Sequence, residues 1–296
     1  MLNAEWLKLT RRPMTWILLS VFLTLMVVYF SAWFLVVALH EGTFTGGAVR
    51  LEVLSAVQIA QLRLQLSFPG IFGAVLGWVN GVGGICAVIM TAGMMGSEYT
   101  WGTLRMQLSR NPNRRRYLFI KLGALLLLFL AGIIIALSVG ALMVLMYGTI
   151  LGNVGRISAL DLLQLPLSIA RALYVLLPYV LFTFTCAIFG RSVIAGAGGG
   201  LVFLSLDASL GSVAALAKFD PAIQFLYELL IQPNINTLVV LNSSNYGLDQ
   251  AILVRSLDLT LLPTPLHATL VVGVYSGFFL FASQRLLEGR DLGGAG

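Results

Sequence analysis

The segment GSEYTWGTLRMQLSRNPNRRR, residues 96–116, separates two long apolar stretches of the chain. It is short, aromatic and strongly basic, whereas residues 68–97 before it and residues 122–151 after it carry no charged side chain. Apolar runs of this length are long enough to cross a lipid bilayer. The contrast therefore predicts a basic loop that joins two membrane spans.

The composition of the whole chain agrees with this interpretation. Of the 296 residues, 58% are hydrophobic and only 10% are charged, whereas a soluble domain carries roughly a quarter charged residues. The apolar runs are continuous and do not alternate with polar residues, which favours helices over a barrel. The sequence thus predicts an all-α, polytopic membrane protein in a single domain, 1–296. Its six spans are expected at about 14–39, 68–97, 121–151, 172–190, 192–212 and 265–284.

The distribution of Lys and Arg predicts how the chain is oriented. If both termini are cytoplasmic, 12 of the 18 Lys and Arg residues fall on the inner side, as expected for cytoplasmic loops. The basic net charge is therefore a topology signal, and it does not indicate nucleic-acid binding. Arg114–Arg116 and Lys121 are expected to anchor the third span among the inner headgroups.

Several segments lie outside the predicted spans. Residues 1–13 have the pattern of an amphipathic helix in the inner membrane interface. On the outer side we expect an amphipathic helix around 51–66 and a short mixed segment at 153–171. The longest outer segment, 217–264, contains apolar pieces at 223–231 and 235–241 that are too short to span.

The basic loop itself is predicted to contain a helix from Glu98 to Arg110. Helical spacing places Trp101, Leu104 and Leu108 on one face, and Tyr99, Thr103, Met106 and Arg110 on the opposite face. The loop would end at 111–113, because the residue before Pro112 is disfavoured in a helix. An ordinary basic loop with an interfacial Trp remains an open alternative.

Two stretches of the chain carry a family resemblance. EYTWGTLRMQLSRNPNRRRYLFIK (98–121) contains an acid, a Gly-Thr pair and a following Leu-Arg pattern, and AEWLKLTRRPMTWILL (4–19) places Glu5, Lys8, Arg11 and Trp16 at the N-terminus. Both closely resemble the permeases of type-two ATP-binding-cassette (ABC-2) transporters, in which this chain would be the six-helix half of a type V exporter. The matching positions of the first stretch are Glu98, Gly102, Thr103, Leu104, Arg105, Leu108, Ser109, Arg110, Pro112, Arg115 and Lys121.

The resemblance implies a function and a set of partners. The loop 98–113 would be a coupling helix that contacts a separate cytosolic ATPase, present in two copies and binding ATP and Mg²⁺ itself. A second permease chain, identical or related, would complete the pore, and a bacterial cytoplasmic membrane would be its location. No phosphate loop occurs in the sequence, and we expect no cofactor, metal or catalytic site in this chain.

The same resemblance assigns coupling to particular residues. Glu98 would sit at the start of the helix and Gly102 would allow close backbone approach, while Tyr99, Met106 and Arg110 would contact the ATPase. The complete set of expected coupling residues is Glu98, Tyr99, Trp101, Gly102, Thr103, Leu104, Met106 and Arg110.

Small and polar residues inside the spans suggest either a translocation path or helix packing. Gly81 and Gly84 in the second span and Gly196 and Gly200 in the fifth have the spacing of close helix contacts. Asn80 is expected to form an interhelical hydrogen bond. Asp207 would either belong to a water-filled cavity, an outer gate or a substrate contact, or lie beyond the end of its span, facing outer water.

Two other function classes remain as alternatives to the permease. One is a membrane-embedded enzyme that modifies lipids, which would need an acid, base or nucleophile cluster that the sequence does not indicate. The other is a structural membrane protein whose basic loop docks a different cytosolic partner.

Overall fold

The structure is a computed structural model that describes residues 2–43, 54–103, 113–211, 217–253 and 258–289. In these ranges, six helices are long and apolar enough to cross a membrane. They are α2 (Pro13–Glu41), α4 (Gly70–Thr100), α6 (Arg114–Ile150), α7 (Ala159–Gly190), α8 (Val193–Leu210) and α13 (Pro265–Glu288). The prediction of an all-α polytopic membrane protein with six spans is confirmed.

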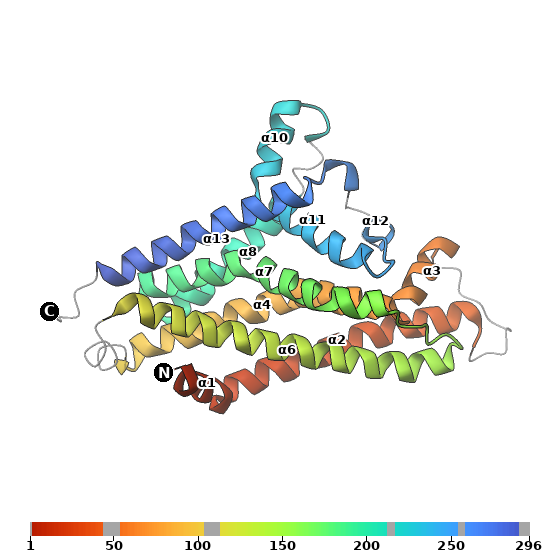
Figure 1. Ribbon diagram of the computed structural model, residues 1–296, viewed down its shortest axis with the longest axis horizontal. Coiled ribbons are helices and arrows are strands. Elements are labelled where there is room, and N and C mark those ends of the chain that lie inside the picture. The colour runs from red at the N-terminus through yellow and green to blue at the C-terminus, as the bar shows by residue number, and fades with distance from the viewer. Residues whose placement is uncertain (1, 44–53, 104–112, 212–216, 254–257, 290–296) are drawn as a thin grey trace.

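Shorter helices lie at the ends and on one side of this bundle (Figure 1). They are α1 (Leu2–Arg11), α3 (Ala56–Gln65), α10 (Pro221–Leu229), α11 (Ile231–Ser244), α12 (Gln250–Leu253) and the 3-10 turn η2 (Leu259–Leu261). We call the end of the bundle that holds α1 and the end of α13 the basal end, and the end that holds α3 the distal end. Figure 1 shows both chain termini at the basal end and α10 projecting sideways.

The fourth span starts well before the predicted residue 172, so the mixed segment 153–171 is a loop only in its first part. Ser158 and Asp161 form a reciprocal capping box that fixes the start of α7. The helix then continues through Arg171, whose Nη1 donates to Asn242 Oδ1 on α11 at 2.6 Å. A charge that finds a partner on a neighbouring helix does not have to end its own helix.

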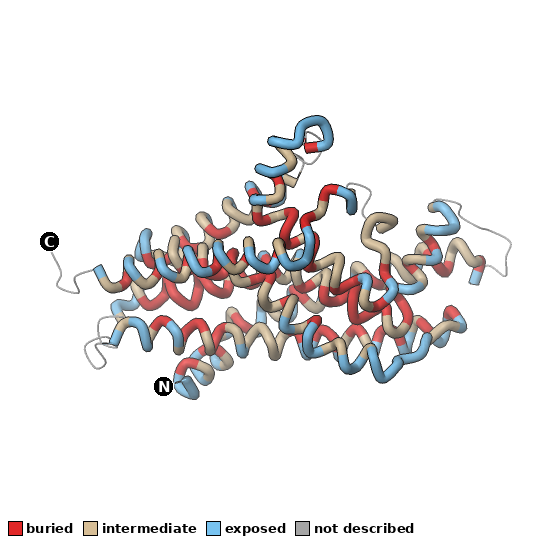
Figure 2. Tube along the Cα trace, turned by 45° about the horizontal axis from the view of Figure 1, so that its top comes forward, coloured by how far each residue is buried: buried red, intermediate tan, exposed pale blue. Residues whose placement is uncertain are grey.

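The centre of the bundle is formed by α4 and α7. In the most apolar 18-residue stretch of each helix, 56% of the residues are buried in α4 and 61% in α7, compared with 17% in α8. Figure 2 shows buried residues along the centre of the bundle. Glycines let α8 approach them closely. A Cβ at Gly200 would lie 2.2 Å from Thr183 Oγ1 on α7 and 2.7 Å from a methyl group of Val88 on α4.

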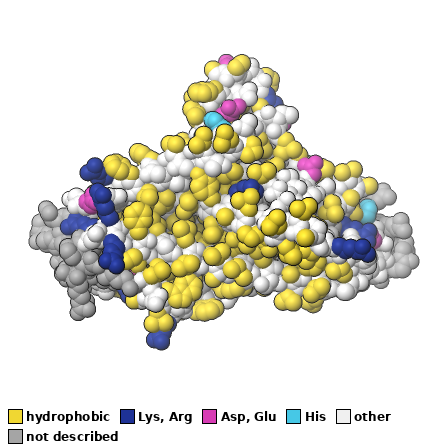
Figure 3. Space-filling model, in the orientation of Figure 1, with side chains coloured by type: hydrophobic (Ala, Val, Ile, Leu, Met, Phe, Trp, Pro, Cys, Tyr) yellow, Lys and Arg dark blue, Asp and Glu magenta, His cyan; other side chains and the backbone are white. Residues whose placement is uncertain are grey.

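The outer surface has the polarity of a membrane protein. In Figure 3, hydrophobic side chains cover the middle of the molecule, while most Lys and Arg side chains on this face lie toward the two ends. This distribution matches a bilayer whose hydrocarbon layer surrounds the middle of the spans.

The packing of α8 predicts that replacing two of its glycines with alanine changes stability differently. Gly200→Ala should lower stability by about 1–3 kcal/mol, because the new Cβ overlaps Thr183 and Val88. Gly198→Ala, where a Cβ would meet nothing within 4 Å, should leave stability unchanged or raise it by up to about 1 kcal/mol through helix propensity. Thermal unfolding of the purified variants in detergent measures both. Equal effects of the two substitutions would contradict the packing described for α8.

Candidate functional site

A buried cluster of charged side chains lies at the basal end. Lys121, near the start of α6, has a side chain only 1% exposed. Its Nζ donates to Glu98 Oε1 in the last turn of α4 and to Glu5 Oε2 on α1, the latter at 3.0 Å. Tyr117, one turn before Lys121, donates its hydroxyl to Glu98 Oε2. One ammonium group therefore joins three helices from distant parts of the sequence, and we call Glu5, Glu98, Tyr117 and Lys121 the basal ion cluster.

The electrostatics of the basal ion cluster make it a strong constraint. The side chains of Glu98 and Lys121 are 3% and 1% exposed, and a buried charge is costly unless it is paired and hydrogen-bonded. Burial alone would raise the pKa of Glu5, but the charge of Lys121 and the hydrogen bonds from Lys8 and Lys121 outweigh it and lower that pKa. Glu5 is therefore held in its ionised form.

A second set of contacts fixes α1 to the start of α2. Pro13 begins α2, and Thr15 Oγ1 donates back to the carbonyl of Leu9 at 2.7 Å. Trp16 Nε1 donates to the carbonyl of Thr10 at 2.8 Å. The chain thus bends sharply between the two helices, and the bend is held by side chains on both sides of it.

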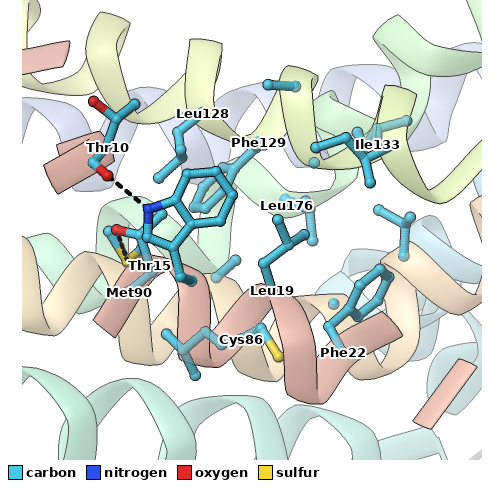
Figure 4. A pocket seen from close by; sticks show the side chains of 18 of the residues that line it. Thr10, Thr15, Leu19, Phe22, Cys86, Met90, Leu128, Phe129, Ile133 and Leu176 are labelled. Carbon is cyan, nitrogen blue, oxygen red and sulfur yellow. Dashed lines mark hydrogen bonds between the residues drawn. The ribbon is translucent and has the colours of Figure 1, made fainter. Parts of the chain in front are cut away.

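An apolar pocket of about 190 Å³ lies behind this bend, between α1, α2, α4, α6 and α7. Figure 4 shows Leu19, Phe22, Leu128 and Leu176 pointing into it, with Thr15 directed toward Met90. Because the pocket borders α1, that helix is not packed against a solid core along its whole length.

The ends of α6 and α13 also meet at the basal end. Arg114 Nη1 donates to the carbonyls of Leu287 and Glu288, each at 2.7 Å. Arg115 Nε pairs with Glu288 Oε1 at 2.7 Å. The first turns of α6, which follow segment 104–112, are therefore connected both to α1 and to α13.

The structure corrects the start of the predicted helix 98–110, whose part from residue 104 on lies outside the described residues. Glu98 lies in the last turn of α4, which ends at Thr100, and not in the first turn of a separate helix. A carboxylate at a helix C-terminus is unfavourable for the helix dipole, so its ionic partner on α6 compensates for its position. Gly102 has φ +66°, and a Cβ there would meet nothing within 4 Å. Its role in the structure is a left-handed turn, and the expected close backbone approach stays a prediction.

The remaining coupling residues divide into two groups. Leu104, Met106 and Arg110 lie outside the described residues. Among the described ones, Tyr99 is half-buried against the core and Thr103 is half-buried, whereas Trp101 is 67% exposed. The guanidinium of Arg12 lies 5.5 Å from the Trp101 ring centroid. Trp101 therefore exposes a large aromatic side chain at the basal surface.

The small residues within the spans serve different purposes. Gly196 and Gly200 are buried in tight contacts, with a Cβ at Gly196 falling 2.8 Å from Ala187. A Cβ at Gly84 would make ordinary contacts, and at Gly81 it would meet nothing. The amide atoms of Asn80 are covered but have no hydrogen-bond partner among the described residues, so its predicted interhelical bond is not formed there.

Asp207 is buried in this structure and does not face open water. The side chain is part of α8 and is 5% exposed. Tyr179 donates its hydroxyl to Asp207 Oδ2 at 2.5 Å, and the backbone N–H of Gln232 donates to Oδ1 at 3.1 Å. Gln232 lies in the first turn of α11, where backbone N–H groups lack helical partners. The Asp207 carboxylate therefore caps α11 from another helix.

Sequence reasoning missed the basal ion cluster. Lys121 was expected among the headgroups, but its burial shows that it is no surface anchor. A signal was present, since Lys121 directly adjoins an uncharged run and an ionisable residue at such a place usually has a partner. The partners could not be chosen from the sequence because they lie 23 and 116 residues away.

Comparison with known proteins gives a result for the whole chain. A family model described as ABC-2 family transporter protein matches residues 1–288. Searches of curated proteins and of solved structures returned no match.

The basal ion cluster predicts a large effect of removing its cation. Lys121→Met should lower stability by about 3–5 kcal/mol, since Glu98 would be left buried without its counter-ion and Glu5 would keep only Lys8. Lys8→Met is the matched control, because the side chain of Lys8 is 42% exposed and an exposed pair contributes under about 1 kcal/mol. Thermal unfolding in detergent compares the two, and adding Glu98→Gln to Lys121→Met should recover part of the loss. A loss at Lys121 no larger than that at Lys8 would contradict the cluster.

The lowered pKa of Glu5 predicts a pH dependence. Because the folded-state pKa lies below the ordinary value of 4.5, the contribution of Glu5 to stability is complete above that pH and is lost as the pH falls below it. Wild-type protein should therefore lose more stability than Glu5→Gln on acidification from pH 6 to pH 4. Parallel melting curves at several pH values measure the difference, and identical slopes would show that Glu5 contributes no linked stability.

Proposed function

Because the chain belongs to the ABC-2 transporter family, we propose that it is the permease subunit of an ATP-driven exporter. In this proposal the basal end faces the cytoplasm and carries a separate ATPase subunit. The single observation that supports it most is the basal ion cluster, which connects both flanks of segment 104–112 to α1. The excess of Lys and Arg on the same side supports the orientation.

The proposed coupling is mechanical. A force on segment 104–112 acts on the end of α4 and the start of α6, and the Glu98–Lys121 pair holds these two helices together. The Glu5–Lys121 pair extends the connection to α1. Charge pairs away from water resist separation more strongly than exposed ones, so the three helices would move as one body. The apolar pocket beside α1 gives this body space to move without compressing a filled core.

The proposed assembly contains two permease chains and two ATPases. ATP and Mg²⁺ would bind to the ATPases, and this chain would supply the path, formed with an identical or related second chain. Rocking of the two halves would expose the path to one side and then the other. Small residues that are not used in tight packing, such as Gly81, are candidates for the wall of that path.

Trp101 provides a direct test of this function. The chain would be co-expressed in turn with the ABC ATPases encoded in the same genome, and each complex would be reconstituted in liposomes. Trp101→Ala should reduce recovery of the ATPase with the permease at least about tenfold, as expected for loss of an exposed aromatic anchor at an interface. Phe278→Ala on α13, also exposed at 63%, is the control and should leave recovery unchanged.

The same experiment separates the alternatives. A permease should form a complex whose ATP hydrolysis depends on the chain, whereas a docking protein for another partner would recover no ATPase. Full recovery of the ATPase with Trp101→Ala, or transport activity of the chain without any ATPase, would overturn the proposed coupling.

A further inference from the structure

A cavity of about 630 Å³ lies toward the distal end, between α2, α3, α4 and the α11–α12 region. It extends from Gln58 on α3 to Gly81, which lies about 16 Å along α4 from the start of that helix. This volume falls in the range of small-molecule sites in proteins. The cavity is separate from the basal ion cluster and from the apolar pocket beside α1.

The walls of the cavity are aromatic, amide and aliphatic. Tyr29 and Trp78 are stacked with ring centroids 4.6 Å apart, and Trp33 meets Tyr29 edge-on. Three glutamines, Gln58, Gln65 and Gln250, contribute polar groups. None of the described residues that line the cavity carries a charge. A charged ligand would therefore lose its hydration without gaining a counter-ion from these walls.

Two polar atoms of the walls are available to a ligand. Gln58 Oε1 accepts hydrogen bonds from Ser55, which leaves Gln58 Nε2 as a donor. Gln250 Nε2 donates to Ser243 Oγ at 2.7 Å, which leaves Gln250 Oε1 as an acceptor. Both glutamines are partly exposed. A hydroxyl group can pair with either atom, because it donates and accepts.

The glycines on α4 keep the cavity open. A Cβ at Gly77 or Gly81 would meet no atom within 4 Å, so no close helix packing requires glycine at either position. This contrasts with Gly200 on α8, where a Cβ would overlap its neighbours. Absence of side chains at two positions one turn apart extends the cavity along α4.

We propose that this cavity is a binding site for an uncharged molecule that carries hydroxyl groups next to an apolar body. The hydroxyl groups bond to the amides of Gln58 and Gln250, and the apolar body lies against the aromatic and aliphatic walls. Such a molecule reaches the site either from water or from the membrane. The site rests on the geometry of the cavity alone and holds whether or not the chain works with an ATPase.

The test uses the full chain in lipid nanodiscs and three probes with the same six-carbon tail. These are hexyl β-glucoside, hexyltrimethylammonium and hexyl sulfate, which differ in head-group charge. Titration is followed by tryptophan fluorescence, because Trp33 and Trp78 are two of the five tryptophans and both line the cavity. Only hexyl β-glucoside should give a saturable change in tryptophan fluorescence. Methyl β-glucoside, which has a single methyl group in place of the tail, should bind at least about tenfold more weakly, because contact with the apolar walls is lost.

Three variants assign the binding to the cavity. Gly81→Leu fills the cavity and should abolish saturable binding, whereas Gly277→Leu adds the same side chain to an exposed position of α13 and should not. Gln250→Leu should weaken binding by about tenfold, the effect of one lost hydrogen bond. Equal, non-saturating responses to the three six-carbon probes, or unchanged binding by Gly81→Leu, would overturn the proposal.

Discussion

The position of one ammonium group, that of Lys121, sets the arrangement of the whole basal end. It is almost completely removed from solvent and lies between two carboxylates that come from α1 and α4. Such an arrangement is stable only when all three helices are in place, because each partner that is missing leaves an uncompensated buried charge. The helix ends at this site are therefore held by buried charge pairs as well as by apolar side chains such as Leu9 and Leu118.

The helix α4 connects this constraint to the rest of the molecule. Its basal end carries Glu98, its middle packs against α7 and α8 through contacts such as that of Val88 with Gly200, and its distal half forms one wall of the large cavity through Gly77 and Gly81. Three different physical situations thus follow one another along a single helix: a buried ion pair, close backbone packing and open space. A displacement at either end of α4 has to be accommodated by the tight contacts in the middle.

The sequence predicted what depends on local composition. The length of the apolar runs gave all six spans, and small-residue spacing pointed to Gly196 and Gly200, which the structure places in tight contacts. It failed where a partner decides the outcome. Glu98 was expected to begin a helix and instead ends one, since its counter-ion on α6 outweighs the local preference. Asp207 left two alternatives, and the structure shows a third, because its partner is a backbone group of α11.

The order in which the residues of the basal ion cluster are synthesised has a consequence for folding. Glu5 leaves the ribosome first and Glu98 follows, but their shared counter-ion is synthesised only with the third span. Chains are made from the N-terminus, and early parts can fold before later parts exist. Until Lys121 is synthesised, Glu98 lacks its ammonium partner and Glu5 has only that of Lys8. The first two spans can therefore enter the bilayer early, but α1 reaches its final position only after α6 has been inserted.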